Sequence, residues 1–96
     1  MPDLNVVAVI TANPGGEEAV RDALHALVEP TRREAGCISY ELFESEAKTG
    51  VFVTVELWRS HEALDQHTKS AHLQEAMTSA GSALASADIH PLSPVG

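Results

Sequence analysis

Three stretches of the chain have the β-branched content or the period-two side-chain pattern that is typical of β-strands. These stretches cover residues 4–11, 37–45 and 51–58, and a fourth, shorter one covers residues 87–92. The first and third stretches carry apolar side chains on both faces, whereas a strand with one solvated face carries polar residues on that face. We therefore expect both faces of the sheet to be covered.

Two longer segments have the three-and-four apolar spacing of amphipathic helices. The first is expected from Gly16 to Ala35, with Pro30 kinking or interrupting it because proline lacks the amide that would bond to the carbonyl four residues earlier. Gly36 is expected to supply a left-handed cap at its end. The apolar stripe of this helix consists of Ala19, Val20, Ala23, Leu24, Leu27 and Val28.

After the third strand the pattern predicts a short helix from Ser60 to Gln66 and a longer one from Ser70 to about Ala85, with both serines as N-caps. A short polar turn at residues 46–50 predicts that the second and third strands form an antiparallel hairpin. The resulting order, βαββαβ, is that of a ferredoxin-like α+β fold, and we expect one domain over residues 1–96. Two helices cover only one face of a four-stranded sheet, so a second copy of the chain is the simplest cover for the other face. The pattern thus predicts a homodimer.

Charge and composition exclude several classes of function. The formal net charge is -8 with only 6 Lys and Arg, which argues against binding to the phosphate backbone of nucleic acids. Cys37 is the single cysteine, so no intrachain disulfide can form, and we expect it to be a small buried residue in a cytoplasmic protein. No apolar run approaches the roughly 20 residues that a membrane-spanning helix needs, so no membrane association is expected.

Residues 51–72 concentrate the aromatic and ionisable side chains of the chain. A strand ending in Glu-x-Trp is followed by a serine-capped helix containing Ala-Leu and then by His-x-x-Ser-x-His. The positions concerned are Phe52, Glu56, Trp58, Ser60, Ala63, Leu64, His67, Ser70 and His72. This arrangement resembles the antibiotic biosynthesis monooxygenase (ABM) domain family, in particular its quinol monooxygenase-like members. The resemblance implies back-to-back packing of two sheets into a dimeric α+β barrel.

His67 and His72 are the candidate catalytic residues, because a neutral imidazole can take up a proton near physiological pH. The alternative is that each caps or packs against a helix end, and His61 is expected in an exposed first helical turn. Trp58 and Phe52 share a strand face and are candidates for the wall of an aromatic-sized pocket, although such residues also serve simply as core.

Glu56 lies on the same strand face and is a further candidate for substrate binding. A carboxylate at such a position is expected either to pair with an arginine, for which Arg59, Arg32 and Arg33 are available, or to be held protonated.

Tyr40 and Asn5 are candidate hydrogen-bond donors to a substrate oxygen. Residues 13–16, Asn-Pro-Gly-Gly, lack the spacing and the lysine of a phosphate-binding loop, and the chain has no GxGxxG motif, so no nucleotide cofactor is expected. The histidines at 61, 67 and 72 do not have the i, i+4 spacing of metal ligands on one helix face, so no metal is expected unless a turn between the helices corrects their geometry.

The resemblance also bears on haem. Family members that degrade haem use an asparagine on the first strand, a tryptophan on the short helix and a histidine on the long helix. Here His67 and Met77 stand at the latter two positions, so haem degradation is not expected. The sequence therefore predicts a protein without a bound cofactor.

For the reaction, the resemblance implies an oxygenase without metal or flavin that acts on dioxygen and a hydroquinone- or anthrone-like aromatic. The substrate would supply the electrons, and the protein a dry pocket, a base and hydrogen-bond donors for the resulting anion. Two alternatives stay open. One is a keto-enol isomerase of a small phosphorylated ketone, from a branch that shares the spacing of His67 and His72, and the other is a dimeric ligand-binding module without turnover.

Overall fold

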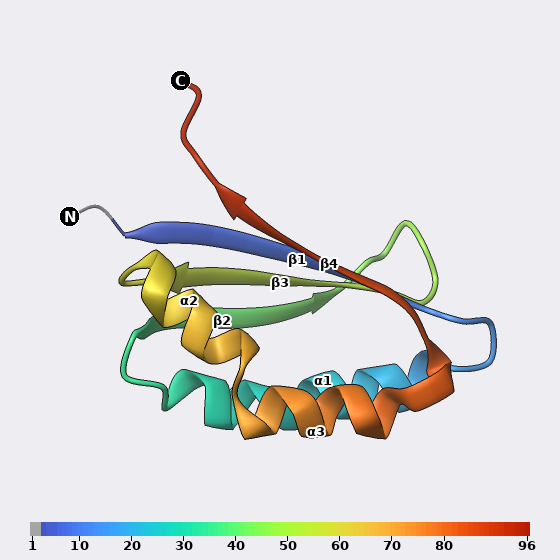
Figure 1. Cartoon of the computed structure of the whole chain (residues 1–96). Coiled ribbons are helices and arrows are strands. Elements are labelled where there is room, and N and C mark those ends of the chain that lie inside the picture. Colours follow the sequence, from blue (N-terminus) through green and yellow to red (C-terminus); the bar gives the residue numbers. More distant parts are fainter. Residues whose placement is uncertain (1–2) are drawn as a thin grey trace.

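The computed structural model describes residues 3–96 and has two layers, a four-stranded sheet and a layer of helices (Figure 1). The sheet has the order β2-β3-β1-β4, and its neighbouring strands are antiparallel. This arrangement confirms the ferredoxin-like α+β fold. The elements are β1 (Leu4–Ala12), α1 (Glu17–Arg32), β2 (Cys37–Glu44), β3 (Val51–Trp58), α2 (His61–Thr68), α3 (Ala71–Ala80), a 3₁₀ turn (Gly81–Ala83) and β4 (Leu84–Leu92).

The core lies between one face of the sheet and the helices. Figure 1 shows α1 and α3 side by side beneath the sheet, with α2 crossing one end of it. Alternate residues of β1 and β3 point into this layer and meet the buried stripe of α1. Burial of each large aliphatic side chain contributes about 1.5–3 kcal/mol. The large buried residues of the core are Leu4, Val6, Ile10, Val20, Leu24, Leu27, Tyr40, Phe52, Trp58 and Leu64.

The end of α1 differs from the expectation. Pro30 lies within the helix and does not interrupt it, because the chain continues in helical conformation to Arg32. Proline removes one backbone hydrogen bond, and only Thr31 and Arg32 follow it in the helix. The amide of Arg33 bonds to the Pro30 carbonyl at 3.3 Å. The helix therefore ends at Arg32 and not at Ala35, and Ala19 of the predicted stripe is exposed.

Gly36 is not a left-handed cap, because the glycines with positive φ in the described chain are Gly15, Gly50 and Gly81. Its role is steric. A Cβ at Gly36 would collide with the Cβ of Ala63 on α2, and the Gly36 carbonyl accepts a hydrogen bond of 2.9 Å from the amide of Arg59. The absence of a side chain lets α2 pack directly over the start of β2.

The two helix starts follow the prediction. The Ser60 hydroxyl accepts a hydrogen bond from the amide of Ala63, and the Ser70 hydroxyl accepts one from the amide of Leu73. The ends again differ, since α2 extends to Thr68 and α3 stops at Ala80. Gly81 ends α3 because it adopts a φ of +50°, and β4 begins soon after it.

The second face of the sheet is not covered by any described helix. Val55 and Phe43 point from this face and are 45% and 54% exposed, respectively. The half-buried residues of the same face are Val7 and Val9 of β1 and Val53 of β3. In the folded chain, β1 and β3 therefore carry apolar side chains on both faces of the sheet. No helix of the described residues is both long and apolar enough to cross a membrane.

The contact at Gly36 gives a first prediction. Replacing Gly36 by Ala should destabilise the protein by about 1–3 kcal/mol, because the new methyl group meets a helix Cβ that cannot rotate away. Chemical denaturation would measure this loss. The matched variant is Gly36→Ala combined with Ala63→Gly, which removes the clash at the cost of about 1 kcal/mol for a helical glycine. If the losses of the two single variants simply add in the double variant, the steric account of Gly36 is wrong.

Candidate active site

A cavity of about 300 Å³ lies between the sheet and the helices. All four strands and all three helices contribute to its wall, which is mostly apolar. The size and the apolar lining are suited to an aromatic ligand, which such sites hold in place with a few polar groups. The polar residues of the wall are Tyr40, Thr54, Glu56, His67, Thr68 and Gln74.

His67 lies in the last turn of α2 with its side chain only 4% exposed. Its ring packs against Trp58, with 4.8 Å between ring centroids, and against Tyr40 at 5.8 Å. Nδ1 of His67 lies 2.7 Å from Oε2 of Glu34. The ring is therefore fixed by packing on its faces and by a hydrogen bond on one edge.

Glu34 contacts both histidines and was not selected by the sequence analysis. It lies just after α1, where its backbone amide bonds to the Thr31 carbonyl and its carbonyl accepts a bond from the amide of Cys37. The same Oε2 atom that binds His67 is 2.8 Å from Nε2 of His72. The turn at Ser70, whose hydroxyl donates to the His67 carbonyl at 2.7 Å, brings the two histidines together.

The two histidines differ in their position relative to the cavity. A carboxylate can only accept hydrogen bonds, so Nδ1 of His67 and Nε2 of His72 must both carry protons. In neutral His67 this leaves the lone pair on Nε2, and no described residue hydrogen-bonds to that atom. His67 lines the cavity, whereas Glu34 and His72 do not. Of the two predicted catalytic histidines, only His67 reaches the cavity, with its acceptor nitrogen available.

Glu56 is buried in the cavity wall at 4% exposure. Its Oε2 accepts a hydrogen bond of 2.6 Å from the Thr54 hydroxyl, and its Oε1 accepts one of 2.7 Å from the indole N–H of Trp58. Of the two alternatives expected for Glu56, the pairing with an arginine is wrong. Arg32 binds the Tyr40 carbonyl and Glu41 instead, and no Lys or Arg belongs to the cavity wall.

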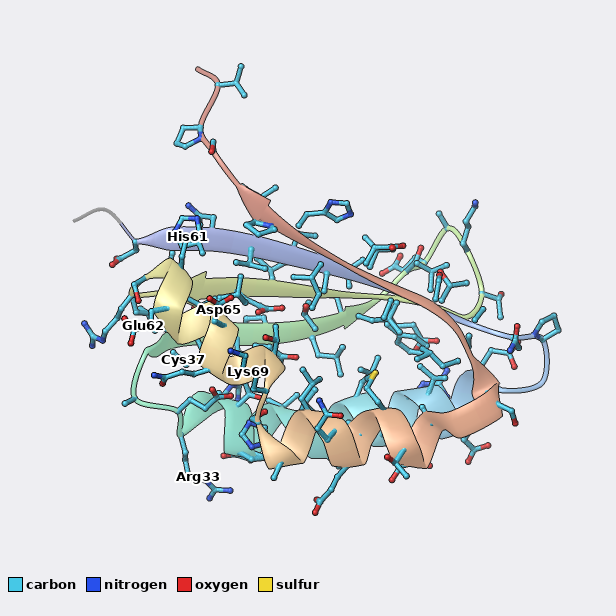
Figure 2. The ribbon with its side chains drawn as sticks, in the orientation of Figure 1. Arg33, Cys37, His61, Glu62, Asp65 and Lys69 are labelled. Atoms are coloured by element: carbon cyan, nitrogen blue, oxygen red, sulfur yellow. The ribbon has the colours of Figure 1, made fainter. Side chains whose placement is uncertain are left out.

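The other two arginines also lie elsewhere. Arg59 is exposed, and Figure 2 shows Arg33 pointing away from the body of the molecule. Figure 2 also labels Glu62 and Asp65, which are exposed on α2, and Lys69, which is exposed directly after it. The charged surface of this region is thus separate from the buried carboxylate of Glu56.

Tyr40 adds a hydrogen-bond donor to the cavity. Its ring is 3% exposed, and burial raises the pKa of its hydroxyl well above the usual value, with the nearby Glu56 charge acting in the same direction. The hydroxyl therefore stays protonated throughout the physiological range. Tyr40 can donate to a substrate oxygen but cannot act as the base.

The remaining predicted site residues lie outside the cavity wall. Trp58 is completely buried, donates a hydrogen bond to Glu56 and packs against the ring of His67. Phe52 is buried beneath Arg21, whose guanidinium carbon is 5.6 Å from the ring centroid. Asn5 is exposed and belongs to the opposite face of the sheet, because it alternates with the buried Leu4 and Val6. The structure therefore brings together His67, Tyr40 and Glu56 at the cavity and places the others elsewhere.

The Glu34, His67 and His72 side chains also form a potential metal site. One ligand atom from each lies within 4.8 Å of the others. The spacing of His67 and His72 argued against shared ligation, but the turn at Ser70 brings their rings together, as the alternative in the sequence analysis allowed.

Comparison with known proteins agrees with this fold. The family model described as "Antibiotic biosynthesis monooxygenase" matches residues 4–79. A Mycobacterium tuberculosis protein named "Putative monooxygenase Rv0793" is 45% identical over 67 residues, which cover 70% of this chain and 65% of that protein. The crystal structure of PA3566 from Pseudomonas aeruginosa superimposes with a TM-score of 0.91 and 33% identity, covering 100% of this chain and 97% of the other.

The structure of Rv0793 matches with a TM-score of 0.86 and 34% identity over 99% of this chain and 97% of that one. The fold and the cavity define a small ferredoxin-like α+β protein with an apolar cavity between its sheet and its helices. The chain belongs to the antibiotic biosynthesis monooxygenase family. Membership of this family supports a monooxygenase-type function.

The environment of Cys37 gives a second prediction. Burial raises the pKa of its thiol to about 11, and the charges of Glu34 and Glu56 add to this effect. The thiolate is the reactive form, so at pH 8 alkylation by iodoacetamide should be at least about tenfold slower in the folded protein than in the unfolded chain. The rate should rise as the pH approaches 11. Equal rates in native and denatured protein at pH 8 would contradict this.

Proposed function

We propose that this protein is a cofactor-independent monooxygenase that oxidises a neutral hydroquinone- or anthrone-like aromatic, with His67 as the general base. The observation that carries the proposal is the hydrogen bond from Nδ1 of His67 to Glu34, made by a ring that lines an apolar cavity. It leaves Nε2 as the acceptor at the cavity and provides a negative partner for the imidazolium that forms when this atom takes a proton.

The reaction would begin with transfer of a phenolic or enolic proton from the substrate to Nε2 of His67. The Tyr40 hydroxyl donates to the substrate oxygen as negative charge develops there. The electron-rich carbon of the anion then forms a bond to dioxygen, and the resulting hydroperoxide loses water. For an anthrone, the methylene carbon becomes a carbonyl, one oxygen atom enters the product, and the substrate supplies all four electrons.

The surroundings of Glu56 favour a substrate that is neutral and carries hydrogen-bond donors. Its carboxylate is buried, its protein partners are the neutral donors Thr54 and Trp58, and the cavity wall provides no Lys or Arg. A second hydroxyl of a hydroquinone would donate to this carboxylate. An anionic ligand would be repelled by it and would find no cation to pair with, so the wall disfavours a phosphorylated ketone and with it the isomerase alternative.

The third prediction tests the base. With an accepted substrate from a panel of hydroquinones and anthrones, His67→Ala should lower oxygen consumption by about two or more orders of magnitude, because a positioned base contributes about 10²–10⁴ in rate. An oxygen electrode provides the measurement, after subtraction of the spontaneous oxidation rate. Activity of the wild-type protein should survive treatment with a chelator.

The matched control for this variant is His61→Ala, since His61 is exposed on the same helix and should leave turnover unchanged. Full activity of His67→Ala on a confirmed substrate would reject His67 as the base. Conversion of a ketone without oxygen uptake would instead favour the isomerase, and binding without conversion would favour a ligand-binding module.

We further propose that two copies pack through the uncovered face of the sheet to form a dimeric α+β barrel. This face presents Val55 and Phe43 to solvent in the single chain, and an apolar surface of this kind in a soluble domain is typical of a protein–protein interface. Back-to-back packing would bury it.

The fourth prediction follows from this arrangement. Sedimentation at micromolar concentration should give a mass near twice the 10.2 kDa of the chain. Val55→Lys, which would bury an unpaired charge in the interface, should shift the protein to monomer. Asp22→Lys on the exposed side of α1 is the control for the added charge and should leave the dimer intact. A monomeric wild-type protein would contradict the barrel.

A further inference from the structure

Glu34, His67 and His72 converge from three parts of the fold. Glu34 follows α1, His67 lies in the last turn of α2, and His72 lies in the first turn of α3. Oε2 of Glu34 is 2.7 Å from Nδ1 of His67 and 2.8 Å from Nε2 of His72, and the three atoms lie within 4.8 Å of one another. Two imidazole nitrogens and one carboxylate oxygen form a ligand set that zinc and related divalent transition metals accept.

We propose that this cluster binds a divalent transition-metal ion such as Zn²⁺ reversibly. The bound ion inhibits the protein because it leaves Nε2 of His67 protonated, so that this nitrogen can no longer accept a proton. The first half of the proposal stands on the cluster alone. The inhibition rests on the function proposed above, in which Nε2 of His67 takes the proton.

The cluster requires only small movements to hold an ion. Zinc lies about 2.0–2.2 Å from nitrogen and oxygen ligands, which places tetrahedral ligand atoms roughly 3.3 Å apart. The two contacts of Glu34 would lengthen by about half an ångström, and the two histidine nitrogens would move closer together. The side chains of Glu34 and His72 are 16% and 24% exposed, so they have room to adjust. Water can fill the fourth coordination position.

Access and charge also suit a cation. Neither Glu34 nor His72 lines the cavity between the sheet and the helices. An ion can therefore reach these two residues from solvent without passing through the proposed substrate site. The described partners of the Glu34 carboxylate are the two imidazoles, with no Lys or Arg to compete for it. The net charge of -8 favours the approach of a cation.

The inhibition follows from histidine tautomerism. A metal ion at Nδ1 of His67 needs the lone pair of that nitrogen, so the ring proton must move to Nε2. The ring stays neutral and gains no proton overall, but the nitrogen available to the cavity changes from acceptor to donor. His72 makes the opposite exchange, from Nε2 to Nδ1. The metal-bound protein would still take up an aromatic ligand and would not deprotonate it.

Zinc titration of metal-free protein in competition with a chromogenic chelator tests the site without any substrate. We expect one Zn²⁺ per chain and a higher melting temperature with zinc. His72→Gln and Glu34→Gln should each weaken zinc binding by at least about tenfold, while His61→Gln, which changes an exposed histidine outside the cluster, should not. Melting curves of the two cluster variants without zinc would show that they are folded.

Three results would overturn the metal site. These are no stoichiometric binding by the wild-type protein, unchanged affinity in folded His72→Gln and Glu34→Gln, or an equal loss in His61→Gln. If zinc binds as expected but leaves oxygen consumption on a confirmed substrate unchanged, the inhibitory role is wrong. If no substrate consumes oxygen at all, the proposed oxygenase fails, while the zinc titration still decides the metal site separately.

Discussion

A single carboxylate oxygen of Glu34 connects the parts of the molecule that form the site. By accepting hydrogen bonds from His67 and His72 it ties the segment after α1 to the last turn of α2 and to the first turn of α3. Hydrogen bonds to a charged group contribute about 1.5–3 kcal/mol each. The orientation and the tautomer of His67 both depend on this contact, and the assignment of the base depends on the tautomer.

The second constraint on the site is the buried carboxylate of Glu56. A carboxylate removed from water is costly unless its oxygens are satisfied, and here each oxygen accepts one short hydrogen bond from its own strand. Such neutral partners satisfy the group without cancelling its charge. The cavity wall thus combines the ring of His67, the hydroxyl of Tyr40 and the carboxyl group of Glu56, and the proposed neutral substrate with more than one hydroxyl rests on this combination.

The sequence predicted the fold well, because strands, hairpin and helix starts depend on local patterns such as alternation and serine caps. It was less successful at helix ends, because tertiary contacts determine the residue at which each helix stops. The sequence predicts a left-handed cap at Gly36, whereas the residue packs closely against Ala63, which belongs to a helix far along the chain. The prediction for Glu56 overlooked that Thr54 and Trp58, two residues to either side on the same strand face, can reach its oxygens.

Glu34 could not have been found from spacing, since it lies 33 and 38 positions before its two partners. The sequence did select His67 and His72, but it could not rank them, because only the packed structure shows which ring lines the cavity. Trp58, Phe52 and Asn5 illustrate the same limit. Alternation assigns each to a face of the sheet, but the position of the cavity along that face is set by the helices above it.

The most direct test of this account is the tautomer of His67 in the resting protein. Long-range ¹H–¹⁵N NMR correlation of the imidazole rings, with His67→Gln used to assign the signals, distinguishes a protonated nitrogen from one with a free lone pair. The account predicts that neutral His67 carries its proton on Nδ1, and that this form is lost in Glu34→Ala. A neutral His67 protonated on Nε2 in the wild-type protein would contradict it.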